Sequence, residues 1–153
     1  MKRNWLVIAS ADHVANGLGG GFMQVCHGKR APLTRIQPGD RVVCYSPNHR
    51  YSASHASRAK DRLQAFTAIG TVRDGGLYRA DMGEGFHPYR RDVAWHEAEQ
   101  TPIWALQGEL SFMQEKNWAY RLRQGLLELN DADMTAIAEA MFTASAAPDR
   151  LAA

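Results

Sequence analysis

Apolar residues in this chain fall into short runs separated by turn residues. Asn4 to Ala9 (NWLVIA) is a near-continuous apolar run with β-branched residues, which predicts a buried strand. Arg41 to Tyr45 (RVVCY), which follows a Pro-Gly-Asp turn, and Leu63 to Val72 predict two more strands. Tyr89 to His96 alternates between two sets of side chains, as a half-buried strand does. Short strands that outnumber helices favour a small curved β-barrel decorated by helices.

Two helices are expected. Ser10 is expected to cap a short helix over residues 11–16 that stops at Gly17. A longer helix begins after Asn130, with acidic residues in its first turn. Its predicted apolar stripe consists of Met134, Ile137, Ala138, Met141 and Phe142. We therefore expect one domain over residues 1–142, followed by an Ala-rich C-terminal tail over residues 143–153.

The remaining segments carry weaker patterns. Asn48 to Arg62 is rich in Ser, His and Arg, which predicts a long exposed loop after Ser46 and Pro47 end the preceding strand. Trp104 to Met113 is expected to form one or two helical turns. Ala119 to Leu129 is expected to be the last strand, with Gly125 as a β-bulge.

The composition is that of a folded globular domain. The 153 residues are 45% hydrophobic and 22% charged, which excludes a disordered, collagenous or coiled-coil chain. No apolar run approaches the roughly 18 residues of a membrane-spanning helix. The short apolar run after Lys2 and Arg3 is soon followed by Asp12, so we expect a strand of a cytoplasmic protein rather than a signal peptide.

Charge is distributed unevenly along the chain. Residues 1–60 contain nine basic and two acidic side chains, whereas residues 61–153 contain nine basic and fourteen acidic ones. Fourteen of the 18 basic residues are Arg, whose planar guanidinium grips phosphate and stacks on bases. This pattern favours an anionic partner such as nucleic acid, although an excess of Arg also fits a GC-rich genome.

Metal and nucleophile chemistry is weakly supported. Cys26, His27, Cys44 and His49 do not have the usual spacing of zinc ligands, so no metal and no cofactor is expected. Adjacent residues on an extended segment point to opposite faces, so Cys26 and His27 cannot act as a thiol and its base together. Reduced thiols are expected, and catalysis is not.

The glycine-rich segment from Gly17 to Gly21 is not a dinucleotide fingerprint. Phe22 stands where that motif requires its third glycine, and the segment follows a helix rather than a strand. The glycines instead allow a tight turn and a close approach to a ligand, and they present Phe22 beside the end of the first strand. Phe22 as an ordinary core residue is the other interpretation.

An ordered series of motifs resembles the EVE domain family across nearly the whole chain. The first half supplies Trp5 to Ser10 (WLVIAS), His13-Val14, Gly20 to Gln24 (GGFMQ), His27 to Lys29 (HGK), Pro32-Leu33, Gly39-Asp40 and Tyr45 to Pro47 (YSP). The second half supplies Pro102-Ile103, Glu109-Leu110, Asn117-Trp118 and Arg123 to Leu126 (RQGL). The resemblance implies an α+β, PUA-like curved β-barrel of five or more strands with flanking helices, similar to the YTH readers of methylated adenine. It also implies binding of nucleic acid, with a modified base flipped into a pocket.

The resemblance also implies the position of that pocket. The expected ligand-binding residues are Ser10, His13, Gly21, Phe22, Gln24, His27, Lys29, Tyr45, Ser46 and Pro47. The expected phosphate-binding residues are Arg50, Arg58, Lys60, Arg121 and Arg123. YTH readers carry Trp near the glycines where this chain has Phe22, so methyladenine, a modified cytosine and other bases all remain open.

Three functions follow from these observations. The first is a non-catalytic reader of a modified base in DNA or RNA. The second is a small nucleotide-acting enzyme in which Cys26, His27 or His13 is reactive. The third is a small-molecule-binding protein that uses the same pocket.

Overall fold

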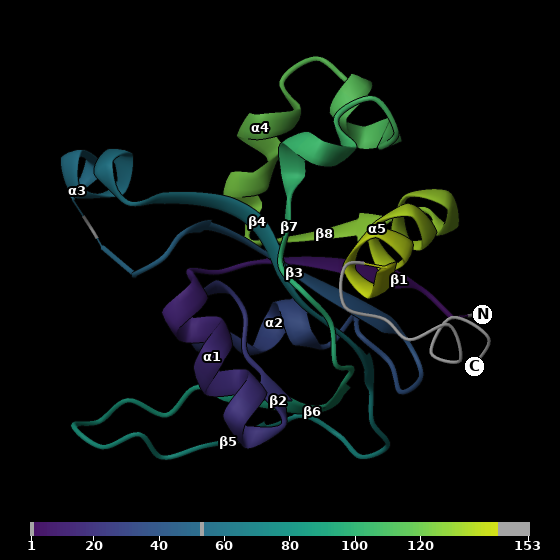
Figure 1. Ribbon diagram of the computed structural model, residues 1–153. Helices are drawn as coiled ribbons and strands as arrows, with labels where there is room; N and C mark the ends of the chain where they lie inside the picture. The colour runs from purple at the N-terminus through teal and green to yellow at the C-terminus, as the bar shows by residue number, and fades with distance from the viewer. Residues whose placement is uncertain (1, 53, 144–153) are drawn as a thin grey trace.

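A strongly curved mixed sheet organises the computed structural model, which describes residues 2–52 and 54–143 (Figure 1). Within these residues the sheet has eight strands: β1 (Asn4–Ile8), β2 (Phe22–Met23), β3 (Arg41–Asn48), β4 (Arg62–Val72), β5 (Tyr78–Arg79), β6 (Tyr89–Trp95), β7 (Thr101–Pro102) and β8 (Leu126–Leu129). The order is β2-β6-β4-β3-β1-β8, with β5 paired to β6 and β7 paired to β4. β1 and β3 run parallel, and the other pairs run antiparallel. The predicted α+β class with a curved sheet and flanking helices is confirmed.

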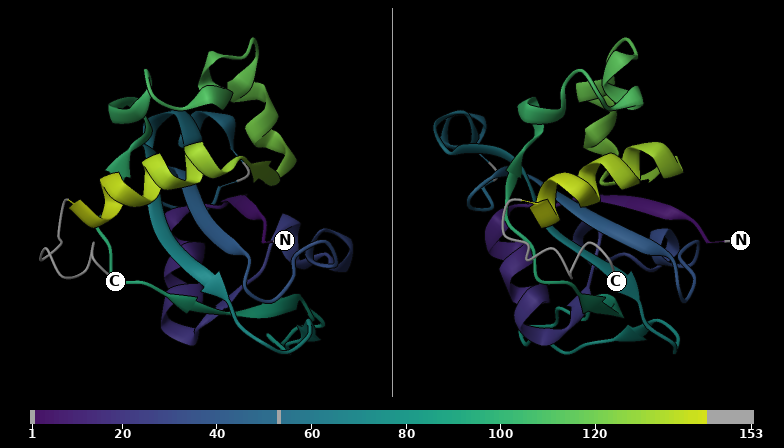
Figure 2. Two further views of the ribbon diagram at one scale, coloured as in Figure 1. Left: turned by 90° about the vertical axis from the view of Figure 1, so that its right-hand side faces the viewer. Right: turned by 45° about the vertical axis from the view of Figure 1, so that its right-hand side comes forward.

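Helices cover both faces of this sheet. The α-helices are α1 (Ala11–Gly20), α2 (Arg30–Leu33), α3 (His55–Lys60), α4 (Trp118–Arg121) and α5 (Asp131–Thr143). The 3-10 turns are η1 (Cys26–Gly28), η2 (Ile103–Leu106), η3 (Ser111–Gln114) and η4 (Leu122–Gln124). α5 and α1 lie on opposite sides of the sheet (Figure 2).

The strand alternation divides the core into two clusters. In β1, Trp5 and Val7 pack with Val14 of α1 and Leu33 of α2 on one face of the sheet. Leu6 points to the other face, where α5, η2 and η3 bury their apolar side chains. β1 therefore contributes alternate side chains to two cores, one on each face of the sheet.

The predicted C-terminal helix is confirmed. Asn130 accepts a hydrogen bond from the amide of Asp133 through its side-chain oxygen, at 2.7 Å, as a helix cap does. Met134, Ile137 and Met141 are fully buried on the stripe that faces the sheet. The expected tail falls at residues 143–153, and all of it beyond residue 143 lies outside the described residues.

Three local predictions are wrong. The first helix continues through Gly17 to Gly20, and Gly21 ends it with a left-handed φ of 72°. β3 continues through Ser46 and Pro47 to Asn48, because antiparallel pairing with β4 extends to Arg62. The long loop that was expected after it contains α3, capped by the hydroxyl of Ser54, which accepts from the amide of Ser57.

The last predicted strand is also wrong in its first half. Residues 118–124 form the consecutive turns α4 and η4, so β8 is limited to Leu126–Leu129. Gly125 ends η4 with a φ of 80° and is a helical cap rather than a β-bulge. In a strand, Tyr120 and Leu122 would lie on the same face, but in these turns Tyr120 is exposed and Leu122 is buried.

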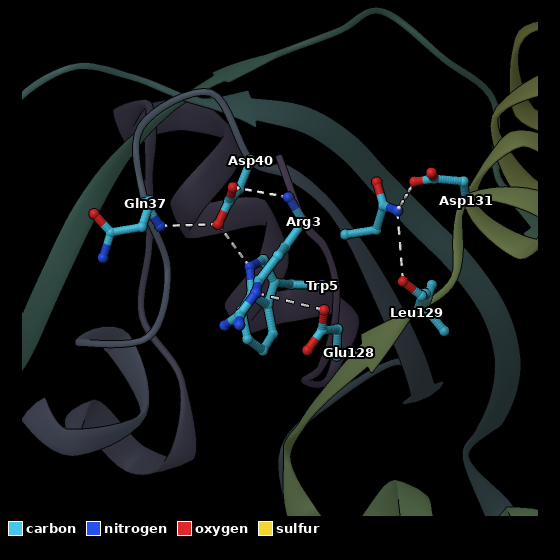
Figure 3. Close-up of polar contacts among 8 residues, drawn as sticks. Arg3, Trp5, Gln37, Asp40, Glu128, Leu129 and Asp131 are labelled. Atoms are coloured by element: carbon cyan, nitrogen blue, oxygen red, sulfur yellow. Dashed lines mark hydrogen bonds and ion pairs between the residues drawn. The ribbon is translucent and has the colours of Figure 1, made fainter. Parts of the chain in front are cut away.

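Asp40 ties the start of β1 to the turn before β3 (Figure 3). Its buried carboxylate accepts hydrogen bonds from Nε1 of Trp5 at 2.9 Å and from the amides of Arg3 and Gln37 at 3.0 and 2.9 Å. Burial on its own raises the pKa of Asp40, but these three donors and the charge of Arg3 hold that pKa below its usual value. The carboxylate therefore satisfies donors that would otherwise be buried without partners.

Candidate nucleic-acid interface

A wide cavity of about 1310 Å³ opens beside the start of α1. Its walls come from the end of β1, α1, the segment from β2 through η1, the end of β3, α3 and η4. These elements meet because β1 and β3 are parallel neighbours, so both strands end at the same edge of the sheet. The cavity is large enough for a nucleotide-sized ligand.

Ten of the residues proposed from the sequence line this cavity. They are Ser10, His13, Phe22, Gln24, His27, Lys29, Pro47, Arg50, Arg58 and Arg123. They come from five separate segments of the chain, which only the tertiary structure brings together.

Five other proposed residues lie elsewhere. Tyr45 is 4% exposed and packs edge-on against Phe66 with ring centres 5.8 Å apart. Burial raises its pKa to about 12. Ser46 is fully buried and shares a hydrogen bond of 2.8 Å with the hydroxyl of Thr67. Both are placed in the sheet because β3 continues beyond them.

Gly21, Lys60 and Arg121 also lie outside the cavity wall. Gly21 forms the left-handed end of α1, and Lys60 is an exposed residue in the last turn of α3. Arg121 donates to the carboxylate of Glu115, which neutralises its charge locally.

The cavity wall is cationic. Six basic side chains line it, and no acidic side chain does so among the residues that the structure describes. Lys29, Arg50 and Arg58 come from the basic first part of the chain, but Arg62, Arg90 and Arg123 come from the part with excess acid. The wall therefore attracts an anion more strongly than the near-neutral net charge implies.

Phe22 and Arg90 form a layered pair on the cavity wall. The Arg90 guanidinium carbon lies 3.8 Å from the centre of the Phe22 ring, which is a close cation–π contact. Nε of Arg90 donates to Oε1 of Gln24 at 2.9 Å, which fixes the plane of the guanidinium. Behind Phe22, α1 is so close that a Cβ added at Gly20 would lie 2.3 Å from a ring carbon of Phe22. The glycine at position 20 is therefore required by the position of this ring.

Aromatic rings also surround the mouth of the cavity. The Tyr51 ring stacks on His13 with centres 5.1 Å apart, and His27 meets Tyr51 edge-on at 6.1 Å. The amide of Tyr51 donates to both carboxylate oxygens of Asp12, at 3.1 and 3.2 Å. Asp12 also accepts from the hydroxyl of Ser10, so this carboxylate joins α1 to the segment after β3.

The Cys26 segment has an unusual backbone. Cys26, His27 and Gly28 have φ values of 49°, 61° and 82°, so two non-glycine residues in succession are left-handed. The Cys26 thiol donates to the carbonyl of Gln124 at 3.5 Å. Burial raises the pKa of Cys26, although the charges of Lys29 and Arg35 oppose this. The thiol is therefore not activated as a nucleophile.

The other cysteine, Cys44, is buried in the sheet, and burial raises its pKa to about 12.

Three residues that were not proposed from the sequence also line the cavity: Tyr51, Arg90 and Trp95. Nε1 of Trp95 donates to the carbonyl of Gly17 at 3.1 Å, which places its ring against α1. The alternation of residues 89–96 places Arg90 and Arg91 on opposite faces of a strand, but it does not show which face meets the cavity. Arg91 is 6% exposed and donates to the carbonyl of Gly75 in the turn after β4.

Two further features concern metals and membranes. Within residues 2–52 and 54–143, no three His, Cys, Asp or Glu side chains come together as metal ligands would. Of the helices in the same residues, none has the length and apolar character to cross a membrane.

The chain is similar to several known proteins in sequence and in fold. A UPF0310 protein of Mesorhizobium japonicum, msl3206, is 52% identical over 144 residues, which cover 92% of this chain and 93% of that one. A UPF0310 protein of Bacillus licheniformis is 40% identical over 133 residues, 86% of either chain. In fold, the chain is similar to the YTH domain of the Zygosaccharomyces rouxii MRB1 protein, which was solved in complex with N6-methyladenosine RNA. The TM-score is 0.54, with 12% identity over 90% of this chain and 85% of that one. The EVE domain model matches residues 3–140, so the chain belongs to the EVE domain family.

Proposed function

We propose that this protein is a non-catalytic nucleic-acid-binding module that holds one base, a modified base, in the cavity beside α1. The observation that carries the proposal is the composition of the cavity wall. It combines aromatic rings, amide and hydroxyl groups and six basic side chains, without an acidic one among the described residues. A flipped nucleotide needs this combination, because its base stacks and donates or accepts hydrogen bonds while its phosphates are anionic.

Arg90 provides the stacking surface in this proposal. Its guanidinium carbon lies 3.8 Å from the centre of the Phe22 ring and its Nε donates to Gln24, so the group is held in place before a base binds. Ser10 and Gln24 contribute polar groups for the base edge. Lys29, Arg50, Arg58 and Arg123 are the candidates for phosphate contacts.

The YTH likeness supports the proposal at the level of the fold. The MRB1 domain was solved with methylated RNA, and its chain follows the same overall path as this one. Phe22 and Arg90 offer a different wall from the Trp of YTH readers. The binding screen below therefore includes several bases and both DNA and RNA.

The enzyme hypothesis has little support from the site. Burial raises the pKa of Cys26, which keeps the thiol protonated near neutral pH. Asp12, a carboxylate near the cavity mouth, is engaged by the amides of His13 and Tyr51.

The test is a binding screen with single-stranded DNA and RNA of about nine nucleotides that differ only in the central base. The panel contains adenine, cytosine and their methylated forms, and affinity is measured by fluorescence anisotropy at one stated salt concentration. We expect at least one modified base to bind about tenfold more tightly than its unmodified parent, and Arg90→Ala to remove that preference. Equal affinity for every base would contradict a reader, and binding of nucleosides alone would favour a small-molecule-binding protein.

A further inference from the structure

Two exposed aromatic side chains outside the cavity each contact a residue of its wall. Trp104 of η2 is 48% exposed, and its Nε1 donates to Oε1 of Gln64 at 3.1 Å. Tyr120 of α4 is 68% exposed, and the guanidinium carbon of Arg123 lies 5.1 Å from the centre of its ring. Gln64 and Arg123 both line the cavity. The two rings therefore lie next to residues that line the proposed base site.

Trp104 is held in position although it is exposed. Gln64 has a left-handed φ of 54°, at the irregularity where β3 and β4 change register between Ser46 and Asn48. Trp104 also rests edge-on against Trp118 at 5.7 Å, and Trp118 rests on the buried Phe112 at 6.2 Å. η2, α4 and η4 lie together at one end of the sheet (Figure 1). A fixed exposed ring loses little freedom on binding, so it is suited to stacking.

We propose that Trp104 and Tyr120 are stacking platforms for bases that flank the nucleotide held in the cavity. This inference rests on the proposed function and makes it more specific: the ligand is a single strand, because paired bases do not expose their faces to side chains. Charge favours this occupant over an apolar protein surface. The guanidinium of Arg123 lies against the Tyr120 ring, and the cavity wall beside both rings is cationic.

The experiment compares three probes: a mononucleotide, a single strand of about nine nucleotides of mixed sequence, and the duplex of that strand. Trp104→Ala and Tyr120→Ala are tested beside Tyr120→Phe, which keeps the ring. Tyr78→Ala is the matched control, since Tyr78 is 39% exposed and lies outside the cavity wall. Thermal unfolding confirms that each variant is folded.

We expect Trp104→Ala and Tyr120→Ala each to weaken binding of the nine-nucleotide strand about tenfold and to leave mononucleotide affinity unchanged. Tyr120→Phe and Tyr78→Ala should bind as the parent protein does, and the duplex should bind more weakly than the single strand. The platforms are refuted if both alanine variants bind the strand normally while Arg90→Ala weakens it, in which case the proposed function stands. Loss of mononucleotide and strand binding in equal measure would also refute them. If the parent protein binds none of the three probes, both proposals fail.

Discussion

The guanidinium of Arg90 lies 3.8 Å from the centre of the Phe22 ring, so the aromatic side chain beside the glycines backs a cation on the cavity wall. The half-buried Phe22 ring and an arginine far away in the sequence thus act as one unit, because their strands pair. Gln24 completes it by accepting a hydrogen bond from Nε of Arg90.

Replacing Phe22 should separate binding from stability. We expect Phe22→Ala to weaken affinity for the nine-nucleotide strand about five- to tenfold, because Arg90 loses its backing. The unfolding free energy should fall by less than about 2 kcal/mol, since the ring is only half-buried. Phe66→Ala is the matched comparison: this ring is fully buried and should cost about 3–5 kcal/mol. Equal destabilisation by the two substitutions would show that Phe22 is a core residue.

Two adjacent glycines of α1 should respond oppositely to alanine. A Cβ at Gly19 meets no atom within 4 Å, so Gly19→Ala should stabilise the protein by about 0.5–1 kcal/mol. A Cβ at Gly20 would lie 2.3 Å from the Phe22 ring, so Gly20→Ala should displace that ring and weaken strand binding. Thermal unfolding and anisotropy measure both effects. Identical behaviour of the two variants would contradict the close packing of α1 on Phe22.

Binding should depend on salt through the cavity wall. Affinity for the single strand should fall between about 50 and 200 mM salt, because phosphate contacts release counterions. Lys29→Ala and Arg50→Ala should each reduce the slope of log affinity against log salt by about 0.7. Arg73→Ala is the control, because this exposed turn residue lies outside the cavity wall. An affinity that is flat across salt would argue for an uncharged ligand.

Asp40 should make stability sensitive to acid. Its pKa is lowered in the folded protein, so its contribution is present above the ordinary carboxyl pKa of about 3.9 and is lost as pH falls through the lower folded value. Asp40→Asn should lower the unfolding free energy at pH 7 by about 1–3 kcal/mol, because an amide group cannot accept from all three donors. The difference from the parent protein should shrink below about pH 4.

Chemical denaturation at a series of pH values measures this dependence. Asp74→Asn, in the exposed turn after β4, serves as the control and should follow the parent curve. A difference between parent and Asp40→Asn that stays constant down to the acid limit would show that Asp40 does not titrate with a lowered pKa.

Cys26 should behave as an unactivated thiol. Its pKa is raised, so its reaction with an aromatic disulfide reagent should show a midpoint above the about 8.5 of an ordinary cysteine. Cys26→Ala should retain strand binding. A fast reaction with a midpoint near neutral pH would instead revive the nucleotide-acting enzyme.

Local sequence patterns were enough to predict several strands and the last helix. β1, β4, β6 and α5 were predictable because period-two and helical apolar patterns reflect burial on a face that each element carries with it. The motif order also identified the family, and ten of the residues proposed from the sequence line the cavity. Ser10, Phe22 and Gln24 could be named because they lie close to the end of the first strand and the glycine turn.

Tertiary structure alone decided which side chains face the cavity. Tyr45 and Ser46 became buried because β4 pairs with β3 past them, and Arg90 reached Phe22 because β2 pairs with β6. A strand was expected from Ala119, but residues 118–124 form helical turns. These turns bury Leu122 and leave Tyr120 exposed. The pattern of apolar and polar residues predicts whether a side chain is buried or exposed. The strand pairing and the curvature of the sheet determine which neighbour satisfies that need.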